Sequence, residues 1–277
     1  MQRLLASTRA RVALGLVALH AALALLGPVW LWVAPDALAL NPLHEFELPS
    51  RDAWLGRAEN GVSLAAALLV GARASLGVAG IATVVSLGIG ALVGSLSALA
   101  GRRVDALVLR VLDVLAAFPG ILLAIYLAAV LPPSPWTVIA ALCATGWVGF
   151  ARVARTSVQG ILGREHVTAA RALGVGPARV LLRHVLPLAL SPLVVQASFA
   201  LSGNILAEAS LAFLGLGPPP GTPSWGALLD EGVTYLFAAP HLALLPGLLI
   251  ASAVLAFHVL GDALLLALDI RSAPRHP

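Results

Sequence analysis

The chain has 277 residues, of which 60% are hydrophobic and 11% are charged, whereas soluble domains carry about 25% charged residues. This composition indicates a membrane protein. All 17 basic residues are arginine, so the chain has neither the lysine of a phosphate-binding Gly-Lys-Ser/Thr loop nor a Schiff-base lysine. No cofactor motif is expected, and nucleic-acid binding is not indicated, because the arginines cluster beside apolar runs rather than on a soluble domain.

Uncharged runs in the first third of the chain predict two membrane-spanning helices and one shorter segment. Residues 12–34 form an uncharged run of 23 residues, which is long enough to cross a hydrocarbon core of about 30 Å and too long for a secretory signal. Residues 60–72 are too few to span, so we expect an interfacial segment or one packed against the bundle. Residues 74–101 provide the second span.

The rest of the chain predicts four further spans. Residues 114–151 are uncharged, and Pro-Pro-Ser-Pro at 132–135 divides them into two helices joined by a tight turn. Residues 185–207 and 232–261 supply the last two spans. The expected fold class is therefore all-α, a polytopic membrane protein with about six transmembrane helices.

Small residues recur at intervals of four along the second predicted span. Such a row lets helix backbones approach closely in lipid, so a helix-packing face is the preferred interpretation and a substrate-lining face is the alternative. The row is Ala82, Ser86, Gly90, Gly94 and Ala98.

The distribution of arginines predicts the orientation, because cytoplasmic segments of membrane proteins carry an excess of basic residues. With both termini inside the cell, fourteen arginines are expected in the cytoplasm and three outside, in a bacterial inner membrane. The cytoplasmic ones are Arg3, Arg9, Arg11, Arg102, Arg103, Arg110, Arg152, Arg155, Arg164, Arg171, Arg179, Arg183, Arg271 and Arg275, and the external ones are Arg51, Arg57 and Arg73. The external loops are acidic, with Asp36, Glu45, Glu47, Asp52, Glu59, Asp230 and Glu231.

A polar, arginine-bearing stretch at 168–187 separates two apolar runs. Good helix formers from Glu165 to Leu173 stop at Gly174, a residue preferred at left-handed helix caps. Pro177 suits the first turn of a second helix. The pattern predicts a short helix, a sharp turn and another helix outside the bilayer.

The same stretch resembles the signature loop of binding-protein-dependent ABC importer permeases, which runs Glu-Ala-Ala, three residues, Gly, nine residues, Ile-x-Leu-Pro. Five positions are in register, and two carry other residues. The matches are Ala169, Ala170, Gly174, Leu186 and Pro187, with Thr168 in place of the Glu and His184 in place of the Ile. The resemblance implies a type I importer fold and a coupling loop, at about 157–187, that docks on an ATPase subunit.

Other motifs narrow the resemblance to the second permease subunit of the dipeptide, oligopeptide and nickel branch. These are Gly71-Ala-Arg-Ala-Ser-Leu76, the set Asp105, Arg110, Asp113 and Pro119, the run from Ile205 to Gly226, and Gly261-Asp262. Two segments depart from the family pattern, the one before residue 71 and the one after Asp262. The implied organisation is an N-terminal helix with an external loop and interfacial segment (1–73), a permease core with five spans (74–271) and a cytoplasmic tail (272–277).

The resemblance also implies partners and a function. The expected partners are a homologous second permease, two ABC ATPase subunits, an extracytoplasmic solute-binding protein and membrane lipid. The expected function is ATP-driven import of dipeptides or oligopeptides, or of nickel or metal chelates, with no enzymatic activity in this chain.

Two acidic residues leave a rival function open. Glu208 is a carboxylate near the outer end of an apolar helix. It is interpreted either as a gate or path residue or as a structural hydrogen-bond partner of the loop at 222–225 or of a neighbouring subunit. Asp113 is expected to form a local ion pair with Arg110. A proton-coupled secondary carrier that uses Glu208 and Asp113 as relay groups is the alternative.

Overall fold

The computed structural model describes residues 7–33, 38–51, 53–219 and 221–268. Within these ranges the regular elements are helices, and the β-type pairing is limited to one isolated bridge between Arg57 and Ser63. The expected tail at 272–277, together with Arg3, Asp36, Asp52, Arg271 and Arg275, lies outside the described residues. The α-helices are α2 (Thr8–Val33), α3 (Leu64–Leu99), α4 (Arg102–Ala117), α5 (Gly120–Val130), α6 (Pro135–Leu162), α7 (Glu165–Ala172), α8 (Pro177–Val180), α9 (Leu186–Phe213), α10 (Trp225–Thr234) and α11 (His241–Ala267). Short 3-10 turns occupy Pro42–His44 and Glu59–Gly61, and a π-helical turn, η4, occupies Leu181–Val185.

Five helices in the described ranges are long and apolar enough to cross a membrane, and the bent pair α4–α5 brings the number to as many as six. The five are α2, α3, α6, α11 and the continuous helix Ala178–Phe213, which joins α8, η4 and α9. The prediction of an all-α membrane protein with about six spans is confirmed.

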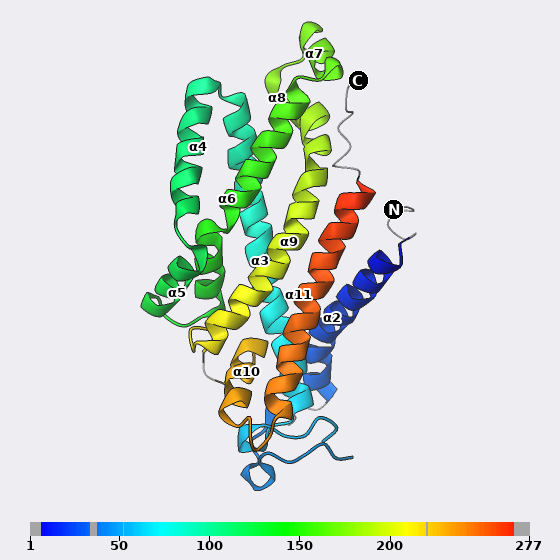
Figure 1. Ribbon diagram of the computed structural model, residues 1–277, viewed down its shortest axis with the longest axis vertical. Helices are drawn as coiled ribbons and strands as arrows, with labels where there is room; N and C mark the ends of the chain where they lie inside the picture. Colours follow the sequence, from blue (N-terminus) through cyan, green and yellow to red (C-terminus); the bar gives the residue numbers. More distant parts are fainter. Residues whose placement is uncertain (1–6, 34–37, 52, 220, 269–277) are drawn as a thin grey trace.

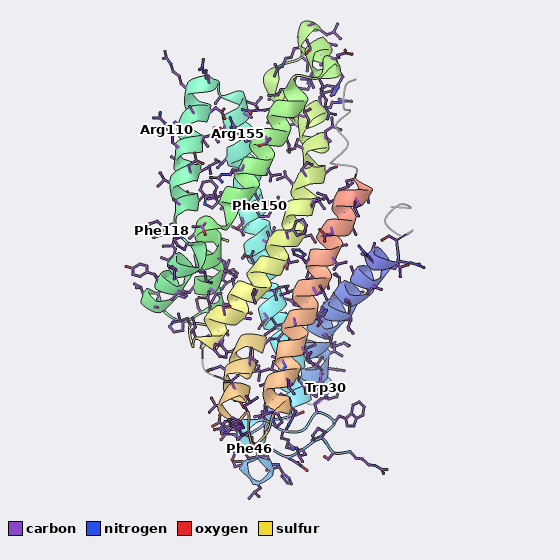
Figure 2. The ribbon with its side chains drawn as sticks, in the orientation of Figure 1. Trp30, Phe46, Arg110, Phe118, Phe150 and Arg155 are labelled. Atoms are coloured by element: carbon purple, nitrogen blue, oxygen red, sulfur yellow. The ribbon has the colours of Figure 1, made fainter. Side chains whose placement is uncertain are left out.

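The long helices lie roughly side by side and give the molecule two distinct ends (Figure 1). One end, which we call the arginine end, carries α7 and the turn between α3 and α4, and the end of α11 and the start of α2 point toward it. The opposite end, the acidic end, carries α10 and the loop segment at 38–63. Figure 2 shows Arg110 and Arg155 toward the arginine end and Trp30 and Phe46 toward the acidic end.

The segment at 60–72 differs from the expected separate interfacial element, because α3 begins at Leu64 and runs without interruption to Leu99. The expected boundary between residues 73 and 74 therefore falls inside this helix. The sequence suggested a break because the charge of Arg73 interrupts the apolar run. In the structure the Arg73 side chain is exposed on the helix surface, where a charge does not interrupt helical hydrogen bonding.

The first of the two helices predicted within residues 114–151, the one at 114–131, is not a single straight helix. α4 ends at Ala117, α5 begins at Gly120, and the two are bent by 75°. Pro119 precedes α5, and a proline restricts the residue before it to extended conformations. Phe118 accordingly has φ −82° and ψ 131°, which ends α4.

The predicted last span at 232–261 is wrong at its start. α10 ends at Thr234, and the chain reverses through a turn in which the N–H groups of Ala238 and Ala239 donate to the carbonyl of Tyr235. α11 then begins at His241. The residues of this turn are uncharged, so an uninterrupted apolar run concealed the reversal.

The row of small residues on α3 packs against α6, which confirms the helix-packing interpretation. A Cβ atom added to Gly90 would lie 2.5 Å from the Phe150 Cβ, and one added to Gly94 would lie 2.1 Å from the Ala151 carbonyl oxygen. Backbones this close exclude any larger side chain at either glycine. The contact fixes the two long helices that connect the arginine end with the acidic end.

Candidate functional site: the segment at 165–187 and the cavity at Glu208

α7 ends in a Schellman motif, a cap in which two backbone N–H groups beyond the helix bond back to its last carbonyls. The N–H of Val175 donates to the carbonyl of Ala170 at 3.1 Å, and the N–H of Gly174 donates to the carbonyl of Arg171 at 2.9 Å. Gly174 has φ +80°, the left-handed conformation that this motif needs and that glycine adopts without steric cost. The predicted helix, its stop at Gly174 and the new helix at Pro177 are all present.

An apolar cluster fixes α7 to the ends of α6 and α9. Val167 and Val180 are fully buried, and they pack with Val158, Val185 and Ala189. Val175, which follows the cap, packs against the same cluster. The cap and this cluster together make α7 and its turn a single body rather than a loose loop.

α8 continues into α9, so the second helix, which was expected to start at Pro177 and lie outside the bilayer, is instead the first part of a membrane-spanning helix. The π-helical turn explains how Pro187 is accommodated. A proline cannot donate to the carbonyl four residues earlier, here that of Arg183, and its ring clashes with that carbonyl. The wider π turn relieves the clash, and the N–H of Leu186 donates instead to the carbonyl of Leu181, five residues back.

The structure brings the predicted loop residues together on one body, and their exposure divides them. Thr168, Ala169 and Gly174 are exposed, whereas Ala170 is buried against the rest of the segment. His184 and Leu186 are half-buried beside the π turn, and Pro187 is exposed.

Leu173 is a surface feature that the motif does not include. Its side chain is 85% exposed, directly beside Gly174. The exposed face of the segment therefore combines an apolar tip with small residues, and the arginines Arg171, Arg179 and Arg183 are exposed around it. In the sequence, a leucine beside the capping glycine of a charged segment could have indicated this apolar tip.

A carboxylate on α4 joins three helices near the arginine end. The Asp105 carboxylate accepts hydrogen bonds from the guanidinium of Arg155 on α6, from Ser97 Oγ on α3 at 2.8 Å and from Gln159 Nε2 at 3.1 Å. The Asp105 and Arg155 side chains are only 15% and 18% exposed. This cluster holds α3, α4 and α6 together at the base of the segment at 165–187.

Asp113 forms a different ion pair from the one expected. Its Oδ1 lies 2.7 Å from Nη2 of Arg152 on α6, whereas Arg110, one turn earlier on α4, is exposed. The expectation of a local pair with Arg110 is wrong, because α6 brings a closer guanidinium to Asp113. The pair is a second bridge between α4 and α6.

Glu208 lies near the acidic end of α9 and is 2% exposed. Its Oε2 atom has no hydrogen-bond partner among the described residues, and no bond to the loop at 222–225 is formed. The loop is held differently, because the backbone N–H of Trp225 donates to Ser75 Oγ at 3.1 Å and the indole N–H donates to the carbonyl of Leu68. The Glu208 carboxyl lies beside the Ser75 hydroxyl, so only Oε2 stays unsatisfied, in a membrane helix where unpaired ionisable groups are costly.

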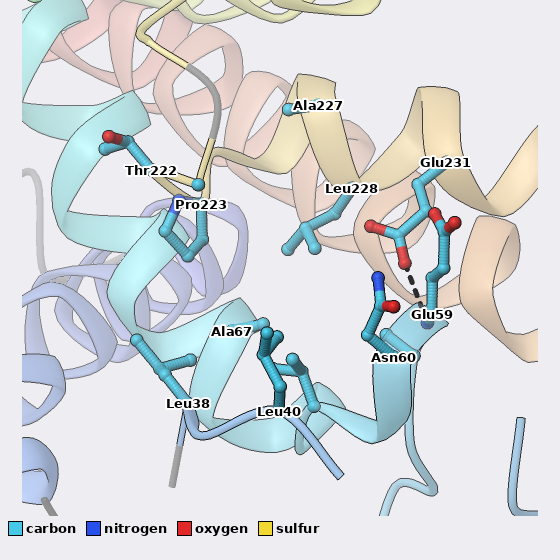
Figure 3. Close-up of a pocket in the computed structure, with 13 residues that line it drawn as sticks. Leu38, Leu40, Glu59, Asn60, Ala67, Thr222, Pro223, Ala227, Leu228 and Glu231 are labelled. Atoms are coloured by element: carbon cyan, nitrogen blue, oxygen red, sulfur yellow. Dashed lines mark hydrogen bonds between the residues drawn. The ribbon is translucent and has the colours of Figure 1, made fainter. Parts of the chain in front are cut away.

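Glu208 lines a cavity of about 470 Å³ between α3, the start of α6 and the loop after α9. The cavity is mostly apolar, and Arg73 also lines it. Thr222 on the loop separates it from a second cavity of about 320 Å³ nearer the acidic end, shown in Figure 3.

The second cavity contains a carboxylate that secures the loop at 38–63. Glu231 on α10 accepts a hydrogen bond through Oε1 from the backbone N–H of Glu59 at 2.9 Å (Figure 3). Burial raises the pKa of Glu231 above its ordinary value, the hydrogen bond from Glu59 lowers it in part, and the nearby charge of Glu59 raises it further. Glu231 therefore ties the loop before α3 to α10, the helix that begins at Trp225.

Comparison with known families shows to which family the chain belongs. Residues 86–272 match the model of the binding-protein-dependent transport system inner membrane component. The chain belongs to this family. It is a permease subunit, not an enzyme, and the resemblance that the motifs indicated is confirmed.

Curated relatives cover most of the permease. It is 36% identical over 229 residues to the dipeptide transport system permease protein of Alkalihalophilus pseudofirmus, an alignment that covers 83% of this chain and 75% of the relative. It is 36% identical over 273 residues to a putative peptide transport system permease protein of Brucella suis, covering 98% of this chain and 90% of the relative. It is 41% identical over 221 residues to the glutathione transport system permease protein of Shigella dysenteriae, covering 80% and 73%.

A solved structure shows the same fold. The permease matches a chain of the inward-facing MetNI methionine ABC transporter with a TM-score of 0.59 and 20% identity. The match covers 73% of the permease and 95% of that chain. The fold is therefore that of an ABC importer transmembrane domain.

Proposed function

We propose that this permease imports peptides and that ATP hydrolysis on two partner ATPase subunits drives the import through the segment at 165–187. The observation that carries the proposal is the capped, anchored α7, which presents Thr168, Ala169 and Leu173 at the arginine end. The names of the relatives support peptides as the substrate class, in preference to nickel or other metal chelates. A homologous second permease would complete the translocation path, and an extracytoplasmic binding protein would deliver the peptide.

The proposed orientation places the arginine end in the cytoplasm of a bacterial cell, with both termini on that side of the inner membrane. Described arginines gather at this end, on α4, at the end of α6 and on the segment at 165–187, whereas the loop at 38–63 carries glutamates. The positive-inside rule favours this direction. Membrane lipid would cover the apolar surfaces that the second permease leaves free.

The geometry supports a lever mechanism. The helix Ala178–Phe213 has 36 residues and, at 1.5 Å per residue, is roughly 54 Å long. It begins beside α7 and carries Glu208 near its other end. A displacement of α7 by the ATPase subunits would therefore tilt one continuous helix and move the wall of the cavity that Glu208 lines. For this reason we propose Glu208 as a gate or path residue.

We also propose that residues 74–271 act as the permease core and that the N-terminal residues 1–73 add a helix and an external loop to it. The family match begins at residue 86, inside α3, and extends to residue 272. α2 packs on α3 and α11 at the outside of this core.

The proton-coupled carrier receives no support from the geometry. Asp113 is held in an ion pair with Arg152 on α6, and Glu208 lines a cavity to which Asp113 does not contribute. Among the described residues no contact joins the two carboxylates into one relay.

Reconstitution tests the proposal. The permease, its second permease and the ATPase subunits are placed in proteoliposomes with the binding protein, and uptake of a labelled dipeptide is measured with ATP or with a proton gradient alone. We expect uptake with ATP only. Uptake with a proton gradient in vesicles that lack the ATPase subunits would contradict the proposal.

The cap of α7 supplies a variant specific to coupling. Gly174→Val forces a β-branched residue into the left-handed conformation, at a cost of about 1–2 kcal/mol, and so deforms the cap. The new Cβ atom meets no neighbour, because nothing lies within 4 Å of its position. We expect ATP hydrolysis to continue and uptake to fall. Gly176→Ala is the matched control, because that Cβ position is equally open and the backbone is not left-handed. Normal uptake by Gly174→Val would contradict the coupling role.

A further inference from the structure

The cavity beside Glu208 differs from an ordinary apolar groove because it contains two opposite charges that do not pair. Its volume is about 470 Å³, within the range of small-molecule sites. Glu208 and Arg73 both line it, from α9 and α3, and no ion pair joins them. The rest of the lining is largely aliphatic and aromatic, and includes Val78, Ile81 and Trp136.

Glu208 is buried, at 2% exposed, and one of its two carboxylate oxygens, Oε2, has no hydrogen-bond partner among the described residues. Buried polar atoms in native proteins are nearly always hydrogen-bonded, so an unsatisfied oxygen on a residue that lines a cavity needs an explanation. A donor that enters the cavity would supply it, and a cationic donor would also offset the buried charge.

Arg73 provides the complementary group. Its side chain is exposed at the same cavity, and it forms no ion pair with any described residue. A guanidinium has its donors arranged in a planar fork that matches the two oxygens of a carboxylate. The cavity therefore offers an acceptor for an ammonium group, a donor for a carboxylate and an apolar surface around them.

We infer that this cavity binds a short zwitterionic peptide, with its α-ammonium group at Glu208 and its carboxylate at Arg73. The apolar lining would contact the peptide side chains. A volume of about 470 Å³ lies within the range of small-molecule sites, which favours a short peptide over a long one. The inference rests on the proposed function, and it specifies which chemical groups of the peptide this chain recognises.

A protection experiment tests the inference without relying on uptake or on the selectivity of the binding protein. Val70 lines the cavity and is half-buried, so Val70→Cys in a Cys143→Ser background places a single reactive thiol there. The variant is assembled with the second permease and the ATPase subunits in proteoliposomes without ATP. The rate of labelling by a thiol reagent is then measured with alanyl-phenylalanine, with its N-acetyl form and with its C-terminal amide.

We expect the free dipeptide to slow labelling and each blocked peptide to protect about tenfold less well, since each lacks one charge-assisted hydrogen bond. Adding Glu208→Gln should remove the preference for a free amino group and leave the preference for a free carboxylate. Adding Arg73→Gln should do the reverse. Asp230→Asn and Arg51→Gln, exposed charges toward the same end of the molecule, are the matched controls and should preserve both preferences.

Two results would overturn the inference: equal protection by free and blocked peptides, which would make the cavity a purely apolar surface, or no protection by any of them. Either could occur in a complex that still imports peptides, in which case the proposed function would stand and only this site would be wrong. A complex that imports no peptide under the conditions of the uptake assay would instead contradict the proposed function.

Discussion

Gly94 lies where α3 and α6 are in close backbone contact, so a single methyl group there should separate them. In Gly94→Ala the new Cβ would lie 2.1 Å from the carbonyl oxygen of Ala151 and 2.9 Å from its carbonyl carbon. A Cβ atom essentially never lies closer than 3.0 Å to a non-bonded heavy atom, so the helices must move apart by roughly 1 Å. The obstructing atoms belong to the backbone and cannot rotate away.

The expected cost follows from overpacking of a close helix contact. Small-to-large changes in packed interiors cost about 1–3 kcal/mol, and we expect Gly94→Ala to lie toward the upper part of that range, because neither helix backbone can relax locally. The free energy of unfolding can be measured by reversible denaturation of the purified permease in mixed micelles. Gly88→Ala is the matched control on the same helix, where nothing lies within 4 Å of the added methyl group.

The control should be as stable as the wild type or slightly more stable, because alanine favours a helix over glycine by up to about 1 kcal/mol. Equal unfolding free energies for Gly94→Ala and Gly88→Ala would refute the close α3–α6 contact, and with it the interpretation of the small-residue row.

Three further predictions concern individual polar contacts. In a double-mutant cycle, Asp105→Asn and Arg155→Gln should each lower the free energy of unfolding by about 1–3 kcal/mol, because the two groups are hydrogen-bonded in a mostly buried site. The double variant should lose less than the sum of the two single losses, and additive losses would show that the groups do not interact. Because the pKa of Glu231 is raised, the folded protein keeps this proton at pH values where the unfolded chain has lost it, so the acidic end should become less stable as the pH rises from the ordinary glutamate pKa to the folded pKa. Hydrogen exchange at the amide of Glu59, corrected for intrinsic rates, should therefore show less protection at neutral than at mildly acid pH. Glu231→Gln should abolish this difference. Ser224→Ala removes the N-cap of α10 and should cost about 1 kcal/mol in the same unfolding assay, and an unchanged value would show that the cap is dispensable.

The segment at 165–187 was predictable because its signals are local. A helix stop at Gly174 and a helix start at Pro177 each depend on the backbone of one residue, and both are present in the structure. The preference of glycine for a left-handed cap and of proline for the first helical turn does not depend on the rest of the fold.

The errors arose where tertiary structure overrides the apolar pattern. Hydropathy registers the charge of Arg73 as an interruption, although an exposed arginine leaves the helix intact. Conversely, the reversal between α10 and α11 contains no charge, so hydropathy registers one span where the chain turns back.

The cavity beside Glu208 could be predicted only in part. The sequence identifies an unusual carboxylate in an apolar helix, but the Oε2 atom without a partner and the shared cavity with Arg73 depend on how α3, α6 and α9 pack. No local rule places Arg73 and Glu208, 135 positions apart in the chain, at one cavity. Their juxtaposition is a property of the fold.

Crosslinking at α7 tests the central claim most directly. Ala169→Cys in the Cys143→Ser background places one thiol on the exposed face of the segment, and Leu43→Cys, with 94% exposure at the acidic end, serves as the control. In the assembled complex, a short bifunctional reagent should join position 169 to an ATPase subunit, with a yield that changes on addition of ATP, and should not join position 43 to it. A thiol at position 169 that a membrane-impermeant reagent reaches from outside the cell, or that crosslinks to no ATPase subunit, would contradict the account.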